Sequence, residues 1–217
     1  LAESPLMKVS DALTDIAEVS VIATLNLAYQ TVAKRHGYPL DENGTRCSLD
    51  HLAFAVAGYG KLGGIELGYG SDLDLVFIHA MDEQADTDGT KVISGFEFAM
   101  RVAQKFMSLM TTQTLDGRVY EVDTRLRPSG EAGLLVTSLK AFEQYQLKSA
   151  WVWEHQALVR ARSIAGELSL REKFEQLRCR ILTLPRNEET VRVEVLNMRQ
   201  KMKDHLGSSK EQKKDGI

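Results

Sequence analysis

Apolar positions divide the chain into a helical start, a middle rich in strand patterns and a helical remainder. Residues 6–36 carry apolar side chains throughout and contain no Pro or Gly, which predicts one long helix, buried along much of its length and ended by Gly37. From residue 138 onward the spacing is again helical, over about 138–147, 149–164, 167–183 and 186–205.

The middle of the chain alternates between apolar runs and glycine-rich or acidic loops. Runs rich in branched and aromatic residues predict strands at 52–57, 72–79 and 119–126, with 134–136 as a short fourth strand. Helical spacing predicts one helix over 91–113. This order of elements predicts an α+β fold.

Two aspartates mark the start of the second predicted strand. Because strand side chains alternate, Asp72 and Asp74 point to the same face, with Cα atoms roughly 6.5 Å apart. At an effective dielectric constant of about 20, two carboxylates at that distance repel each other by roughly 2.5 kcal/mol. A bridging divalent cation removes this cost, and Mg²⁺ held by carboxylates and substrate phosphates is a common arrangement. The pair alone more often marks a strand start with two solvated acids, and only the rest of the chain favours a metal site.

The loop before this strand, residues 58–70, holds six glycines and is called the glycine-rich loop below. Gly58, Gly60 and Gly63 match a dinucleotide-binding fingerprint, but that fingerprint requires a crossover helix leading to a parallel strand, which takes about a dozen residues. Only eight residues separate Gly63 from Asp72. We therefore expect antiparallel strands joined by a loop whose backbone N–H groups cradle phosphate, with Lys61 as its one cation. A merely mobile loop is the alternative.

Asp123 lies on the polar face of the third predicted strand, together with Glu121, Arg125 and Arg127. One interpretation is a solvated edge with ion pairs worth about 0–1 kcal/mol each. The other makes Asp123 a third metal-binding carboxylate, or the base that takes the acceptor's proton, while Arg125 and Arg127 balance charge on a phosphate. The position alone does not decide between them.

Composition narrows the class of protein. The chain has 217 residues, 43% of them apolar and 26% charged, as in a folded globular protein. A net charge of −3 argues against a general nucleic-acid surface, and no uninterrupted apolar run approaches the roughly 18 residues of a membrane span. Cys47 and Cys179 stand alone, which fits a reducing cytoplasm. Because the chain starts at Leu1 and ends in a polar stretch, we expect a piece of a longer protein.

Three strings of the sequence resemble the glutamine synthetase adenylyltransferase family, within the polymerase-β-like nucleotidyltransferase superfamily. They run from Gly58 to Leu75, from Tyr120 to Gly130 and from Trp153 to Arg162. The first reads Gly-Tyr-Gly-Lys-Leu-Gly-Gly-Ile-Glu-Leu-Gly-Tyr-Gly-Ser-Asp-Leu-Asp-Leu, and the second reads Tyr-Glu-Val-Asp-Thr-Arg-Leu-Arg-Pro-Ser-Gly. The resemblance extends over about residues 50–206.

The resemblance implies a nucleotidyltransferase core at 46–137, a helical lead-in at 1–45 and a helical domain at 138–217, truncated at its end. It implies that Asp72, Asp74 and Asp123 hold two Mg²⁺ ions and catalyse the reaction. Nucleotide contacts would then come from Gly70 and Ser71, from Arg125 and Arg127, and from one of the pairs Gly60-Lys61 and Gly63-Gly64, between which the sequence does not choose. Arg160 and Arg162 are either phosphate ligands or, more commonly for such a pair, structural.

The resemblance also implies an activity. In this family one half of a bifunctional cytoplasmic enzyme transfers AMP from ATP to a tyrosine of glutamine synthetase. The other half removes the AMP by phosphorolysis, and the PII signalling protein and glutamine set the balance. The segments Tyr59–Gly64, Glu66–Asp72 and Leu126–Gly130 look more like the C-terminal, adenylylating half. The deadenylylating half, another small-substrate nucleotidyltransferase and a degenerate nucleotide-sensing module are the alternatives, and neither a nucleic acid nor a membrane is expected as a partner.

Overall fold

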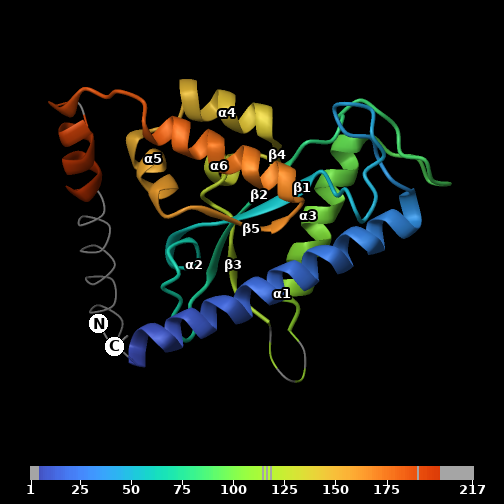
Figure 1. Ribbon diagram of the computed structural model, residues 1–217, viewed down its shortest axis with the longest axis horizontal. Coiled ribbons are helices and arrows are strands. Elements are labelled where there is room, and N and C mark those ends of the chain that lie inside the picture. Colours follow the sequence, from blue (N-terminus) through green and yellow to red (C-terminus); the bar gives the residue numbers. More distant parts are fainter. Residues whose placement is uncertain (1–4, 114, 116, 118, 190, 201–217) are drawn as a thin grey trace, which may run out of the picture.

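The computed structural model describes residues 5–113, 115, 117, 119–189 and 191–200. Its elements follow in the order α1 (Pro5–His36), β1 (Phe54–Gly58), α2 (Gly60–Gly63), β2 (Leu73–His79), α3 (Gly95–Thr111), β3 (Val122–Asp123), the 3-10 helix η1 (Gly130–Ala132), β4 (Val136–Ser138), α4 (Leu139–Lys148), α5 (Val152–Val159), β5 (Arg162–Gly166) and α6 (Leu168–Leu182). The fold is a mixture of helices and a small sheet, as the sequence predicts (Figure 1).

The strands form one mixed sheet in the order β3-β2-β1-β5, with β4 also paired to β2. Strand β1 is antiparallel to both β2 and β5, whereas β3 and β4 run parallel to β2. The antiparallel pairing of β1 with β2 confirms that no crossover helix follows the glycine-rich loop. A dinucleotide-binding fingerprint is therefore excluded by topology.

Helices cover both faces of the sheet. In Figure 1, α1 and α3 lie on one side of the strands and α4, α5 and α6 lie on the other. Strand β2 shows why, because Leu73, Leu75 and Phe77 join the core cluster of α1 and α3, whereas Val76 and Ile78 join the cluster of α4, α5 and α6. This alternation puts Asp74 on the second face, next to Val76 in the strand's period of two.

Helix α1 confirms the predicted long helix but not the predicted extent of its burial. Its inner face, with Ala17, Val21 and Leu25, packs in the core, while Ile16 and Val19 are 57% and 66% exposed. Among the described helices, the part of α1 from residue 7 to 36 is long and apolar enough to cross a membrane. The core helix of a soluble protein passes the same test. Polar and charged residues interrupt this stretch, so it does not contradict the expectation that the chain has no uninterrupted apolar run of about 18 residues.

Two sequence predictions about strands were wrong. The third strand, predicted over 119–126, is limited to Val122–Asp123, because the chain turns after Asp123 and the Arg127 N–H donates to the Thr124 carbonyl at 3.3 Å. The helix predicted over 149–164 ends at Val159, and a fifth strand, Arg162–Gly166, pairs with β1. Arg162–Gly166 is five residues long and mixes polar with apolar side chains. It carries no clear period, so its pairing with β1 decides its conformation.

Strand β5 affects the domain boundaries predicted at residues 45 and 137. These boundaries stay a prediction, but the sheet itself crosses the second one, since β5 lies beyond residue 137 and pairs with β1. Helices α4 and α6 also share a core cluster with β1 and β2. A separate helical domain from residue 138 onward is therefore not shown. The last predicted helix, 186–205, is helical at 188–189 and 191–200, and its remainder lies outside the described residues.

Candidate functional site

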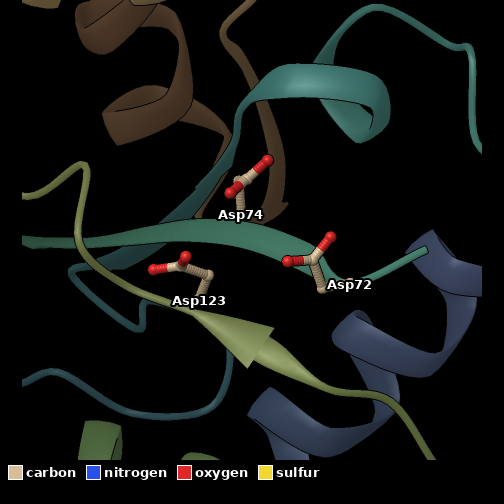
Figure 2. Close-up of side chains that lie close together, drawn as sticks. All are labelled: Asp72, Asp74 and Asp123. Carbon is tan, nitrogen blue, oxygen red and sulfur yellow. The ribbon is translucent and has the colours of Figure 1, made fainter. Parts of the chain in front are cut away.

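Three aspartates come together where β2 and β3 run side by side. Asp72 directly precedes β2, Asp74 is its second residue, and Asp123 ends β3. The parallel register pairs Asp74 with Asp123, and one carboxylate oxygen of each of the three residues lies within 4.8 Å of the other two. Figure 2 shows the three side chains gathered at this point. The juxtaposition expected from the sequence is confirmed, although the role of each residue stays a prediction.

The electrostatics of Asp74 reflect this crowding. Burial raises the pKa of the Asp74 carboxyl above its ordinary value, and the nearby carboxylates of Asp72 and Asp123 raise it further. The positive charges of Arg125 and Lys61 act in the opposite direction and do not cancel the shift. Asp74 thus carries unbalanced negative charge in a half-buried position.

Asp123 has the opposite shift for a different reason. Hydrogen bonding from the Arg125 side chain holds the pKa of the Asp123 carboxyl below its usual range. The Arg125 Nε atom donates to Asp123 Oδ2 at 2.8 Å, and the Arg125 backbone N–H donates to Asp123 Oδ1 at 2.8 Å. Arg125 therefore lies against Asp123, after a turn, and does not continue the strand alternation that the sequence pattern indicated.

The glycine-rich loop brings backbone next to Asp74. A Cβ atom on Gly60 would lie 2.3 Å from Asp74 Oδ2, and Gly60 has a φ of +56°, which side chains rarely adopt. The Tyr59 backbone N–H donates to the Asp74 carbonyl at 2.9 Å. Of the two glycine pairs predicted from the sequence, the pair Gly60-Lys61 is therefore the one with a glycine against the acids.

The pair Gly63-Gly64 has a packing role. A Cβ atom on Gly63 would lie 2.0 Å from the Arg160 carbonyl oxygen, and one on Gly64 would lie 3.0 Å from Arg160 Nε. Arg160 also pairs with Glu66 of the same loop. Arg162, the first residue of β5, donates to the Leu62 carbonyl at 3.3 Å. These contacts support the structural interpretation of Arg160 and Arg162, because both arginines pack against the glycine-rich loop.

Gly70 and Ser71 lie at the end of the loop that leads into Asp72, and the side chain of Lys61, from α2, reaches them. Lys61 Nζ donates to Ser71 Oγ at 3.4 Å, and the Gly68 backbone N–H donates to the same hydroxyl at 3.3 Å. Gly70 has a φ of +68° with open space around it, so a glycine suits this turn. Lys61 is exposed, and its ammonium links the start of the loop to Ser71 at its end. Its role as a phosphate ligand stays a prediction.

Arg127 differs from Arg125 in what it contacts. Its guanidinium donates to the backbone carbonyls of Thr124, Glu131 and Gly133 and thereby holds the turn after β3. The phosphate-binding role expected of Arg127 is not tested by these contacts, which occupy the side chain.

An open polar cavity of about 480 Å³ lies beside the acids, lined by Asp72, Glu121, Val122, Asp123, Thr124, Arg125, Arg127 and Glu131. Glu131 was not anticipated from the sequence, because no motif marks it.

The donor set at this site fits a hard divalent cation. Carboxylate oxygens are the preferred ligands of Mg²⁺, Mn²⁺ and Ca²⁺, and three of them converge here. Burial and two neighbouring carboxylates destabilise the charged form of Asp74, so a cation between the three groups removes an existing cost. The cavity beside the acids leaves room for phosphate oxygens to complete the coordination.

A small mixed sheet flanked by helices, with an acidic cluster beside a glycine-rich loop, is consistent with a protein of the nucleotidyltransferase kind. The sequence comparisons give the particular family, since the glutamate-ammonia ligase adenylyltransferase family matches residues 1–177. The chain belongs to this family.

Several relatives carry the same description. A bifunctional glutamine synthetase adenylyltransferase/adenylyl-removing enzyme of Acinetobacter baylyi is 84% identical over the whole chain, which spans 24% of that relative's length. One of Pseudomonas aeruginosa is 53% identical over 204 residues, 94% of this chain and 20% of the relative. The chain thus spans about a quarter or less of these relatives, whose names combine two opposed activities.

Proposed function

We propose that this chain carries the site that transfers AMP from ATP to a tyrosine of glutamine synthetase. The observation that carries the proposal is the convergence of Asp72, Asp74 and Asp123 within 4.8 Å beside the glycine-rich loop, in a member of an adenylyltransferase family. The proposal includes use of Mg²⁺ and location in the cytoplasm. The PII signalling protein would regulate the full-length enzyme.

Each group at the site has a task in this proposal. Asp72, Asp74 and Asp123 would hold two Mg²⁺ ions, which when bound stabilise charge on the attacking and leaving oxygens of an in-line displacement. The tyrosine oxygen attacks the α-phosphorus of ATP and pyrophosphate leaves. The backbone at Gly60, with Lys61, Gly70 and Ser71, would position the triphosphate. Asp123 would accept the proton of the tyrosine hydroxyl.

The choice of the adenylylating direction rests on sequence strings in the loop and in the turn after β3. Gly58-Tyr-Gly-Lys-Leu-Gly-Gly64 and Leu126-Arg-Pro-Ser-Gly130 resemble the adenylylating half of the family, whereas the deadenylylating half more often has Arg-Pro-Phe-Gly. The second candidate function is therefore phosphorolytic removal of AMP. The relatives' names support it as an alternative, because they include adenylyl removal beside adenylyl transfer.

The experiment uses ATP labelled at the α-phosphate, Mg²⁺ and unmodified glutamine synthetase. It is run on this chain and on the full-length Acinetobacter baylyi relative carrying the equivalent changes. We expect label on a glutamine synthetase tyrosine, with a loss of about a hundredfold to a thousandfold for Asp74→Asn, the scale of removing one electrostatic group from an active site. Phosphate-dependent release of ADP from adenylylated glutamine synthetase, sensitive to Asp74→Asn, would instead assign the removing activity. Transfer by Asp74→Asn at the normal rate would contradict both.

A further inference from the structure

Arg125 lies directly on one of the three candidate metal ligands. Its Nε atom donates to Asp123 Oδ2 at 2.8 Å, Nη2 donates to the same oxygen, and its backbone N–H donates to Asp123 Oδ1 at 2.8 Å. Both carboxylate oxygens of Asp123 are therefore engaged by one residue. A metal ion that takes Asp123 Oδ2 as a ligand must share it with, or take it from, the guanidinium.

Asp123 and Arg125 differ in how far their side chains are exposed to solvent. The Asp123 side chain is only 16% exposed, whereas the Arg125 side chain is 68% exposed. Arg125 also lines the open cavity beside the acids, together with Glu131 of η1. Arg125 can therefore turn away from Asp123 into this cavity without leaving a packed core, while Asp123 stays in place.

Charge gives a reason for such a movement. Without a cation, the three carboxylates carry a strongly negative field, and Arg125 is the neighbour that compensates it at Asp123. Two divalent cations would reverse the sign of that field, and like charges within about 4–6 Å oppose each other. A bound triphosphate would offer the displaced guanidinium a new set of anionic oxygens.

We propose that Arg125 is an internal counterion that competes with divalent metal for Asp123 and passes to the nucleotide phosphates when metal and nucleotide bind. The proposal rests on the proposed function, because it requires the three aspartates to be a metal site. It makes Arg125 a positioning residue that weakens metal binding before nucleotide arrives and strengthens binding of the metal–nucleotide complex afterwards.

The test measures Mn²⁺ binding by electron paramagnetic resonance, without nucleotide and then with an unreactive ATP analogue. Without nucleotide, Arg125→Gln is expected to bind Mn²⁺ about two- to fivefold more tightly, the range that the loss of one exposed ion pair produces. With the analogue, the same variant is expected to bind the complex more weakly than the wild type does. Arg46→Gln is the matched control, because Arg46 also pairs with an aspartate, Asp88, and is 55% exposed. Its metal affinity is expected to equal that of the wild type.

The outcomes separate the two proposals. If Arg125→Gln binds Mn²⁺ as the wild type does or more weakly, Arg125 does not compete for Asp123 and the inference is overturned. An equal gain in Arg46→Gln would show a general charge effect and overturn it as well. If Asp74→Asn binds Mn²⁺ as tightly as the wild type does, the three aspartates are not a metal site and the proposed function fails first. Thermal unfolding of each variant checks that it is folded.

Discussion

At the scale of single residues, the charge on Asp74 destabilises the fold. Its carboxyl is half buried and faces two other carboxylates, so its pKa is raised in the folded state. The folded state therefore holds a proton at pH values where the unfolded chain, with a pKa near 3.9, has lost it. Stability falls as the pH rises from about 4 through the raised pKa, and the cost remains at neutral pH.

Removing this charge should stabilise the protein while it destroys the metal site. We expect Asp74→Asn to raise the melting temperature at pH 7 without metal by about 2–4 °C, the shift that ~1 kcal/mol causes in a protein of this size. Added Mn²⁺ should then stabilise the wild type and not the variant. Differential scanning calorimetry measures both effects. Asp50→Asn removes the same charge from an exposed position, and it should change neither the melting temperature nor the stabilisation by Mn²⁺. A lower melting temperature for Asp74→Asn would contradict the account.

Gly60 provides a second test at this scale. A Cβ atom there would lie 2.3 Å from Asp74 Oδ2, so Gly60→Ala must displace the carboxylate. We expect Mn²⁺ affinity to fall about tenfold to a hundredfold, as changes beside a metal ligand do. Gly44→Ala is matched in backbone strain, with a φ of +79° and open space around it. It should cost ~1 kcal/mol of stability and leave Mn²⁺ affinity unchanged. Equal metal affinity in both variants would remove Gly60 from the site.

At the scale of elements, a histidine joins the loop after α1 to the connection between β5 and α6. His51 Nε2 lies 3.0 Å from Asp41 Oδ2, and His51 Nδ1 lies 2.8 Å from Glu167 Oε1. The hydrogen bond to Asp41 is the main cause that raises the pKa of His51. A raised histidine pKa gives stability that is fully present below the unfolded value near 6.5 and is lost as the pH rises through the folded value.

The His51 contacts therefore predict a pH-dependent cost of substitution. His51→Gln should lower the free energy of unfolding by about 1 kcal/mol at pH 6, because the pair of contacts is partly exposed, and by clearly less at pH 9. Urea unfolding of both proteins at the two pH values measures the difference. An equal cost at pH 6 and pH 9 would show that the charge on His51 contributes nothing.

The elements also show what sequence could predict. The long helix, the two central strands and their antiparallel pairing were predictable, because a long apolar pattern and a loop too short for a crossover leave few choices. Strand β5 was not, since Arg162–Gly166 is short and follows a helical pattern, and only its pairing with β1 makes it a strand. The sequence placed Arg125 on one face with Asp123, where an ion pair was one interpretation. It did not predict the turn after Asp123, which brings both the backbone N–H and the side chain of Arg125 onto this carboxylate.

At the scale of the whole molecule, the sheet topology favours binding of ATP over binding of NAD. Strands β1 and β2 are antiparallel, so the glycine-rich loop does not open a crossover helix of the kind that binds NAD. We expect ATP to bind with an affinity that rises with Mg²⁺, because the three carboxylates repel the triphosphate until metal neutralises them. Isothermal titration with ATP and with NAD, each with and without Mg²⁺, measures this. Tight NAD binding, or ATP binding independent of metal, would contradict the interpretation of the loop.

Only part of the candidate site was predictable from the sequence. The three aspartates were predictable, because two share a strand and the third follows in a motif of the family. The division of labour among the glycines was not, since Gly60 meets Asp74 whereas Gly63 meets the Arg160 carbonyl, nearly a hundred residues further along the chain. Such contacts depend on how β5 and α5 pack against the glycine-rich loop. The local sequence pattern does not predict this packing.

The most direct test of the central claim is a crystal structure of this chain with Mn²⁺ and an unreactive ATP analogue, in which anomalous scattering locates the metal. The account predicts Mn²⁺ in contact with Asp72, Asp74 and Asp123, the triphosphate along the glycine-rich loop, and the Arg125 guanidinium turned from Asp123 toward the phosphates. A structure with the nucleotide fully bound and no Mn²⁺ on these three carboxylates would contradict it.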